Sequence, residues 1–420
     1  MGHLVGKDLY RNLGRKIDGT TARTPWNETL HQILVKLYTP EEAELIVRMP
    51  YGVSTLAQIE AVTQIEGSRL QRLLDGLCDK GLVLDIRAGD ACRYTVSPLV
   101  VGIFEFTMMR TRGELDSEEW ARLFHEYLQD GTTYYRSNWG NGQKISPLRA
   151  LPHEEALEDS GHVEILDYEK AGSIVSSART CAVGICSCRH EKMHVGEKRC
   201  DIPLETCSSF DAAAETLIRH GMAREVSREE MKDNLDRSKE KGLVLCADNV
   251  RNDISFICHC CSCCCNVLLG VSRFGYPNVV VSSNYIARVE EDDCILCGEC
   301  VESCPVNAIK DGHNGDATEV DETTCLGCGV CVLSCQTGAM KLLSREQRTY
   351  CPEDTFERVI LQSLEQGTLQ NLLFGNPRKL SHTFLRGFVG GFLKLPPVKR
   401  ALLGDQLRSR FLSTLRGSPG

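Results

Sequence analysis

The chain has 420 residues, 23 of which are cysteine, and a formal net charge of −9. This length is sufficient for about two to four domains with buried cores. The cysteines are clustered instead of being spread as a disulfide framework, and no apolar signal sequence is evident, so we expect reduced thiols and a cytoplasmic location. Because no apolar run reaches the 18 to 20 or so residues that cross a bilayer, membrane-spanning helices are not expected.

Residues 25–100 predict a small domain of helices and a hairpin. Apolar side chains at helical spacing favour a helix over residues 28–47, Ser54 is suited to cap a second helix, and a third covers residues 69–79. A hairpin over residues 82–96 follows. This order resembles a winged helix-turn-helix domain. Because basic and acidic residues balance in the third helix, we expect a scaffold or dimerisation role and no DNA partner.

Residues 101–285 predict a mixed α/β region whose loops carry many thiols. Helices are expected over residues 211–221 and 228–242. The candidate metal ligands fall in two groups, Cys186, Cys188, Cys200 and Cys207 in the first, and Cys258, Cys260, Cys261, Cys263, Cys264 and Cys265 in the second. Six thiols in eight residues exceed what a protein core needs, and thiolates are soft ligands that suit iron–sulfur clusters.

The sequence leaves the use of these thiols open. The first group alone could supply a further [4Fe–4S] cluster, or both groups could share one site while the spare cysteines hold another cluster. We expect one or two additional iron–sulfur clusters here. The alternatives are zinc on Cys188, Cys200, Cys207 and a histidine, or a redox-active dithiol pair within residues 260–265. His259 is either a ligand or a hydrogen-bond donor to one.

A short cysteine motif occurs twice in residues 286–345. The first copy reads Cys294-x2-Cys297-x2-Cys300-x3-Cys304-Pro305, and the second reads Cys325-x2-Cys328-x2-Cys331-x3-Cys335. This spacing is the ligand run of proteins with two [4Fe–4S] clusters, whereas structural zinc sites favour paired Cys-x2-Cys units. The segment resembles a bacterial-type 2[4Fe–4S] ferredoxin domain. It departs from the pattern at Gln336, which replaces the proline of the first copy.

In two-cluster ferredoxins the fourth ligand of each cluster comes from the other copy. The resemblance therefore implies cluster 1 on Cys294, Cys297, Cys300 and Cys335, and cluster 2 on Cys325, Cys328, Cys331 and Cys304. Together with the cysteine pattern of residues 186–265, the segment is similar to large multi-cluster 4Fe–4S binding proteins of anaerobic bacteria, over about residues 80–400. That resemblance implies no specific activity.

Residues 352–420 predict a basic helical tail. From residue 372 to residue 420 there are nine basic residues and one acidic residue, a net charge of +8, which leaves −17 for residues 1–371. A helix with an apolar stripe is expected over residues 398–415. The stripe could pack on the protein itself, dock to an acidic redox partner, or make peripheral contact with the cytoplasmic face of a membrane.

These features predict a multidomain α+β iron–sulfur protein. We expect it to transfer electrons at low potential through two [4Fe–4S] clusters and at least one further cluster, for redox protein partners or within a reductase complex. An electron carrier or electron-transfer subunit is favoured over a stand-alone enzyme. The alternatives are an oxidoreductase with a substrate site in the middle region, and a redox-responsive winged-helix regulator. No dinucleotide-binding or P-loop motif is present.

Overall fold

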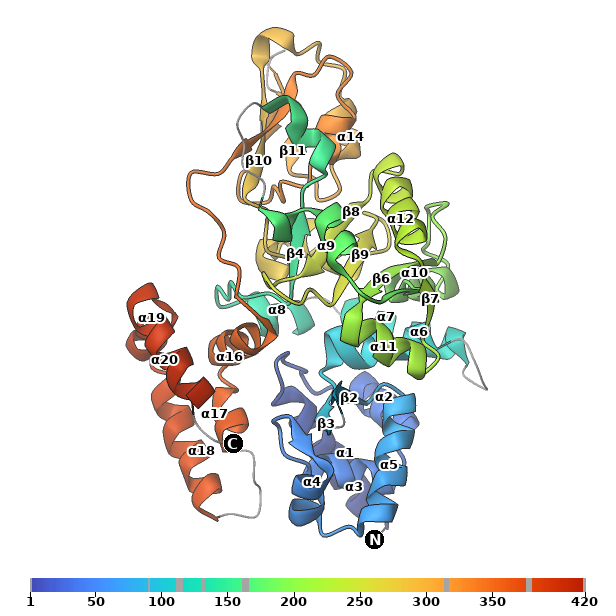
Figure 1. Cartoon of the computed structure of the whole chain (residues 1–420), viewed down its shortest axis with the longest axis vertical. Helices are drawn as coiled ribbons and strands as arrows, with labels where there is room; N and C mark the ends of the chain where they lie inside the picture. Colours follow the sequence, from blue (N-terminus) through green and yellow to red (C-terminus); the bar gives the residue numbers. More distant parts are fainter. Residues whose placement is uncertain are drawn as a thin grey trace. The chain divides into compact units, whose positions relative to one another are not determined.

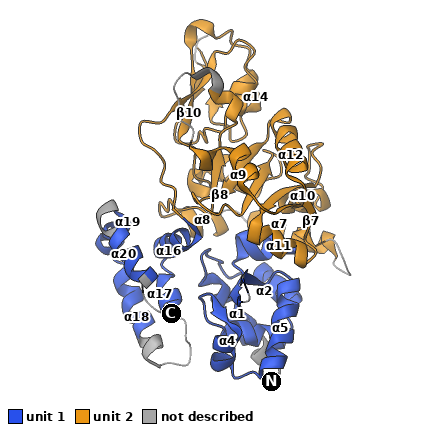
Figure 2. Ribbon diagram, viewed as in Figure 1, with its two compact units in different colours: residues 1–107, 354–420 blue, residues 108–353 orange. Residues whose placement is uncertain are grey.

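The computed structural model describes residues 2–89, 91–110, 116–129, 133–160, 166–312, 317–374 and 380–417. The chain is of mixed α+β type and divides into two compact units (Figure 2). Unit 1 contains residues 1–107 and 354–420, and unit 2 contains residues 108–353. The two ends of the chain therefore share one unit, which the sequence did not indicate.

The amino-terminal part of unit 1 is a helical bundle with a small antiparallel sheet. Its elements are α1 (Gly2–Asp18), α2 (Glu28–Leu37), α3 (Pro40–Arg48), β1 (Ser54–Thr55), α4 (Leu56–Thr63), α5 (Gly67–Asp79), β2 (Val83–Ala88) and β3 (Ala91–Val96). The strand order is β1-β3-β2. Leu13 and Ile17 of α1 are fully buried, as are Leu30 and Ile33 of α2, so α1 is part of this core.

Two boundary predictions in this region are wrong. The single helix expected over residues 28–47 is divided in two, because Thr39 caps a new helix with Pro40 at its first position and Glu42 closes a reciprocal capping box. Ser54 lies in β1, and the cap of α4 is Thr55.

The basic residues near α5 are engaged within the domain. Arg69 pairs with Glu41 at 2.6 Å, and Lys80 pairs with Glu42 at 2.8 Å. Both acidic partners belong to α3. These ion pairs reduce the positive charge that a nucleic acid would meet on this face.

The carboxy-terminal part of unit 1 is entirely helical where described. It comprises α16 (Thr355–Gln366), α17 (Leu369–Leu373), α18 (Leu380–Leu393), α19 (Pro396–Leu403) and α20 (Asp405–Gly417). The single helix expected over residues 398–415 is wrong, because the chain breaks at Gly404 and a second helix begins. Its apolar stripe packs on the core of the same segment, where Leu364 and Leu412 are buried and Phe411 and Leu415 are partly buried. None of the helices within the described ranges is long and apolar enough to span a bilayer.

Unit 2 contains a six-stranded antiparallel sheet of order β4-β8-β9-β6-β5-β7 (Figure 1). The strands are β4 (Leu148–Leu151), β5 (Cys181–Ile185), β6 (Glu205–Phe210), β7 (Ala223–Val226), β8 (Val244–Asp248) and β9 (Phe256–Cys260). The helices of this part are α6 (Phe104–Met109), which begins in unit 1, α7 (Ser117–Gln129), α8 (Thr133–Trp139), α9 (Ala171–Ser177), α10 (Ser187–His194), α11 (Asp211–Arg219), α12 (Arg228–Glu240) and α13 (Asn266–Ser272). The two helices expected over residues 211–221 and 228–242 are present as α11 and α12.

The ferredoxin-like segment also belongs to unit 2. It contains β10 (Tyr285–Val289), α14 (Glu299–Ser303), β11 (Ile309–Lys310), β12 (Glu319–Val320), α15 (Val330–Leu333) and β13 (Met340–Ser344). Strand β10 pairs with β13, and β11 pairs with β12, both antiparallel. Each pair joins a strand of one motif copy to a strand of the other. The copies are therefore interlocked, and a ligand from one copy can reach the loop of the other.

Short helical turns complete the connections. They are η2 (Glu154–Ser160), η3 (Asp167–Glu169), η4 (Pro277–Val279) and η5 (Glu291–Asp293), whereas η1 (Leu99–Ile103) is an irregular turn with non-helical backbone angles at residues 100–102.

Candidate metal centres

The loop of the second motif copy encloses a cavity with about 320 Å³ of empty space. Its four cysteines are Cys304, Cys325, Cys328 and Cys331. Three come from the second copy and Cys304 comes from the first. The rest of the lining is mostly apolar and includes Val306, Ile309, Leu326 and Leu342. The structure thus gathers the four residues that the sequence grouped as cluster 2.

The loop of the first copy forms another cavity, with about 350 Å³ of empty space, which we call the first cavity, and the cavity of the second copy is the second cavity. Its four cysteines are Cys294, Cys297, Cys300 and Cys335, the set grouped as cluster 1. Here Cys335 is the member from the other copy. Met340, Thr318 and Thr337 also line this cavity. The two cavities share no cysteine, so each has its own set of four thiols.

Each of the two cavities has the four cysteines that an iron–sulfur cluster needs, and the surroundings of these cysteines also suit a bound cluster. Burial raises the pKa of Cys328 to about 12 and that of Cys331 well above its usual value. A thiolate in so apolar a place needs the positive charge of a metal. Backbone N–H groups also point at ligand sulfurs, from Ala308 to Cys304 Sγ at 3.2 Å and from Met340 to Cys335 Sγ at 3.4 Å. Such hydrogen bonds stabilise thiolate ligands and tune cluster potentials.

The second loop is anchored to its surroundings within unit 2. The backbone N–H of His153 donates to Cys328 O at 2.9 Å, and that of Ser283 donates to Leu326 O at 2.9 Å. Arg345 Nη2 donates to Cys325 O at 2.6 Å. The His153 side chain continues to Leu243 O at 2.8 Å, next to β8. The second loop therefore lies against the six-stranded sheet.

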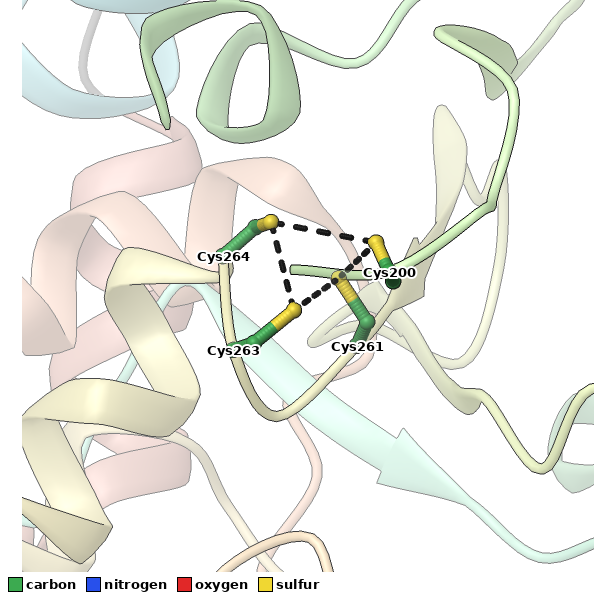
Figure 3. Close-up of side chains that lie close together, drawn as sticks. All are labelled: Cys200, Cys261, Cys263 and Cys264. Carbon is green, nitrogen blue, oxygen red and sulfur yellow. Dashed lines mark hydrogen bonds between the residues drawn. The ribbon is translucent and has the colours of Figure 1, made fainter. Parts of the chain in front are cut away.

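The structure divides the ten middle cysteines into two sets. In one set, the Sγ atoms of Cys200, Cys261, Cys263 and Cys264 all lie within 4.8 Å of one another (Figure 3). The zinc alternative that combined Cys188, Cys200, Cys207 and a histidine is not the grouping that the structure forms. All 23 cysteines are free of disulfide bonds.

The other six cysteines lie on the sheet or at the starts of two helices, and of these Cys260 and Cys265 are buried while the other four are half-buried. Cys186 precedes α10, Cys188 lies in its first turn, and Cys265 precedes α13, while Cys207 lies in β6 and Cys258 and Cys260 lie in β9. Several are close neighbours, since the Cys265 thiol raises the pKa of Cys188, and the Cys246 thiol raises the pKa of Cys260 to about 12.

Cys246 belongs to this group of thiols, and sequence reasoning missed it. It lies opposite Cys258 in the pairing of β8 with β9. The Cys260 thiol lowers the pKa of Cys246, but burial and other thiols, including Cys328 of the second loop, raise it above its usual value. Cys246 is therefore next to Cys258 and within electrostatic reach of Cys328. Cys246 is a single cysteine in an apolar strand and is not part of a spaced cysteine motif. Only the pairing of the strands shows that it lies beside the other thiols.

Both ring nitrogens of His259 are engaged by hydroxyl groups. Nδ1 contacts Ser238 Oγ at 2.6 Å, and Nε2 contacts Ser208 Oγ at 2.8 Å. Burial lowers the pKa of His259 to about 3, so the ring is neutral. Both ring nitrogens thus bond to β6 and α12, which favours the interpretation of His259 as a residue that supports the neighbouring cysteines over that of a metal ligand.

Three charged residues of α10, Arg189, Glu191 and Lys192, are buried. Arg189 is fully buried and donates to Pro203 O at 3.0 Å and to His259 O. Burial lowers its pKa, but the thiols of Cys186 and Cys261 more than reverse this effect. Lys192 is also fully buried and pairs with Glu191 at 2.7 Å. Arg189 therefore places a buried positive charge among the thiols.

Residues 293–339 match the 4Fe-4S dicluster domain family. The match covers both motif copies and all eight cysteines of the two cavities. No curated protein and no solved structure gives a significant match to the chain. The resemblance to multi-cluster proteins of anaerobic bacteria and to winged-helix domains stays a prediction. Family match and geometry together identify residues 293–339 as an iron–sulfur domain of the 4Fe-4S dicluster type.

Proposed function

We propose that the chain is an electron-transfer protein whose dicluster domain binds two [4Fe–4S] clusters. Cluster 1 is bound by Cys294, Cys297, Cys300 and Cys335, and cluster 2 is bound by Cys325, Cys328, Cys331 and Cys304. The observation that carries this proposal is that each set of four lines a cavity of its own, with one member from the other copy. When bound, such clusters supply one-electron transfer at low potential.

The residues of the chain hold, orient and shield this chemistry. The paired strands β10 and β13 fix the two copies against each other. The N–H groups of Ala308 and Met340 stabilise the ligand sulfurs that they contact. Apolar side chains such as Leu326 and Leu342 exclude water from the second cavity. No acid–base residue is needed for this function.

The two cavities have different surroundings, and this difference favours electron transfer between a partner at the first loop and the middle region at the second loop. Ile295 and Leu296, in the first loop, are 63% and 50% exposed. Four acidic residues, Glu290, Glu291, Asp292 and Asp293, precede this loop. We assign this face to a redox protein partner with a basic docking surface, because opposite charges favour encounter. The second loop faces inward, toward Cys246 and the middle thiols.

A third cluster within the inner thiols would complete this route. Cys186, Cys188, Cys207, Cys258, Cys260 and Cys265 supply more than the four thiolates that a further cluster needs. Their support is their mutual proximity, together with Cys246, which lies opposite Cys258 in the pairing of β8 with β9. The two clusters of the dicluster domain can transfer electrons whether or not this third cluster is present.

Anaerobic iron and acid-labile sulfide analysis of the full chain tests both parts. Two clusters correspond to about eight iron atoms per chain and three to about twelve. Substitution of Cys304 and Cys335 together by serine removes one ligand from each dicluster site, and we expect a loss of up to about eight iron atoms. A chain with wild-type iron after both changes would contradict the dicluster assignment. A wild-type content of about eight would contradict only the third cluster.

A further inference from the structure

We propose that Cys200, Cys261, Cys263 and Cys264 bind a single Zn²⁺ ion in a tetrahedral site of four thiolates. This site is separate from every iron–sulfur cluster and fastens together the two cysteine-rich loops of the middle region. It does not depend on the electron-transfer function, since its evidence comes from a different part of unit 2.

The distances between the four sulfur atoms fit one metal ion (Figure 3). Cys200 Sγ lies 3.7 Å from Cys261 Sγ and 3.9 Å from Cys264 Sγ. Cys263 Sγ lies 3.9 Å from Cys261 Sγ and 3.4 Å from Cys264 Sγ. Zinc–sulfur bonds of about 2.3 Å in a regular tetrahedron place the sulfurs about 3.8 Å apart. The four thiols are therefore spaced as the ligands of one tetrahedral ion.

A cubane would need a wider arrangement. Its four thiolates bind four different iron atoms at its corners, so their sulfurs surround the whole cluster. The dicluster sets provide an internal comparison, because neither brings its sulfurs together in this way. Among the residues that the structure describes, no other group of His, Cys, Asp or Glu side chains brings three or more ligand atoms as close as this one. The middle set is thus contracted relative to both cluster sets.

The four ligands come from two separate loops. Cys200 lies between α10 and β6, and the other three lie between β9 and α13. Cys264 is fully buried and Cys261 is 8% exposed, and both pack with Ile202 and Leu243. Four protein thiolates leave no open coordination position, which is the pattern of structural zinc. The ion would therefore cross-link the loops without taking part in catalysis.

Arg189 offsets part of the charge of this site. Four thiolates around Zn²⁺ carry a net charge of −2, which is costly in a buried place unless a cation lies nearby. Arg189 neighbours Cys261 and is fully buried. It donates to Pro203 in the loop of Cys200 and to His259 in the strand before Cys261. Arg189 thus spans the two loops that the ion joins.

The consequence of the cross-link is the placement of the remaining thiols. The loop of Cys200 lies between α10, which has Cys188 in its first turn, and β6, which carries Cys207. The other loop connects Cys260 to Cys265. Fixing the two loops at one ion holds these cysteines in a constant arrangement. We expect the zinc site to form the support of the inner thiol group.

The test is metal analysis of the full chain purified anaerobically in the presence of zinc. We expect about one zinc per chain, with four sulfur ligands at about 2.3 Å by X-ray absorption at the zinc edge. Cys200→Ser and Cys263→Ser should each abolish this zinc while the iron of the dicluster domain stays unchanged. Ser262→Ala, in the same loop, and Cys181→Ser, a buried cysteine in β5, are matched controls that should retain it.

Several results would overturn the proposal. They are an absence of zinc in the wild-type chain, nitrogen or oxygen ligands at the zinc edge, and iron in place of zinc at these thiols. If a variant does not fold, the absorption spectrum of the wild-type chain still decides the ligand set. Failure of the dicluster function would instead appear as missing iron with zinc retained, so the two failures are distinguishable.

Discussion

The two copies of the ferredoxin motif have the same ligand spacing in opposite environments. In the first copy Cys297 is exposed, and Leu296 beside it is 50% exposed. In the second copy the equivalent Cys328 is 7% exposed. The first loop is therefore suited to exchange with a partner in solution, and the second to exchange within the protein. Ligand spacing defines where a cluster binds, and the surroundings define what it can reach.

The backbone of the two loops shows how this difference arises. Leu296 and Gly327 occupy equivalent positions, and both have a left-handed backbone, with φ of 56° and 63°. The first loop is open, so a leucine is accommodated at a modest cost in strain. In the second loop a Cβ on Gly327 would lie 2.1 Å from Tyr285 O. Glycine is required there because the loop is pressed against its own protein.

The largest effect is expected from Gly327→Ala. The new methyl group would collide with the backbone of Tyr285, so the second loop must move and its cavity must deform. We expect loss of cluster 2, or about four iron atoms per chain, together with a lower melting temperature. Iron analysis and thermal unfolding measure both effects.

The matched control for this change is Gly298→Ala in the first copy. Gly298 also has a left-handed backbone, with φ of 78°, but a Cβ there meets no atom within 4 Å. Only the backbone cost of about 1–2 kcal/mol should appear, and all iron should be retained. Equal iron loss in the two variants would show that the environments of the two loops do not differ as described.

A smaller but more specific effect is expected from single serine substitutions at the exchanged ligands. Cys304→Ser should affect the second cavity and Cys335→Ser the first, because each residue lines the cavity of the other copy. Combined with Gly327→Ala, Cys304→Ser should therefore cause no further iron loss, whereas Cys335→Ser should cause a second one. If Cys304→Ser instead caused a second iron loss in the Gly327→Ala background and Cys335→Ser caused none, the exchange of ligands between the copies would be refuted.

The dicluster half of this architecture could be predicted from sequence because its information is local. Three ligands of each cavity lie within seven residues, and the strands that join the copies flank them directly. The helix break at Pro40 could also have been predicted from the sequence, since a capping threonine precedes it and a glutamate follows at the spacing of a capping box. It was missed because apolar residues continue at helical spacing across the break.

The middle region could not be predicted to the same degree because its contacts are long-range. The thiol of Cys200 meets a loop 61 residues further along the chain. Cysteine density indicated metal binding, but it could not show which thiols would meet or that Cys246 lies among them. The role of His259 depends on Ser208 and Ser238, which no motif connects to it.

A moderate effect is expected when salt screens the exposed loop. The acidic residues 290–293 next to the first cavity should attract a basic electron acceptor, for which cytochrome c serves as a probe. Stopped-flow reduction by the prereduced chain should slow several-fold as ionic strength rises from about 0.01 M to about 0.15 M. Replacing Asp292 and Asp293 by asparagine should reduce this slope while iron content is unchanged. A rate independent of salt would rule out electrostatic docking at this face.

The smallest effect concerns the potential of cluster 1 relative to cluster 2. Two hydroxyl groups contact ligand sulfurs in the first cavity, Thr318 Oγ1 at 3.7 Å from Cys300 Sγ and Thr337 Oγ1 at 3.7 Å from Cys335 Sγ. A hydroxyl that donates to a thiolate stabilises the more negative, reduced state and so raises the reduction potential. Thr318→Val keeps the shape but removes the hydroxyl.

We expect Thr318→Val to lower the potential of cluster 1 by a few tens of millivolts, the equivalent of about 1 kcal/mol, and to leave that of cluster 2 unchanged. Anaerobic redox titration followed by EPR measures both potentials in one sample. Thr324→Val is a control, because its hydroxyl donates to Asp321 at 2.7 Å instead of to a sulfur. A shift in the reduction potential of cluster 2, or an equal shift in the control, would show that the hydroxyl of Thr318 does not act specifically on cluster 1. The two copies would then not differ in this respect.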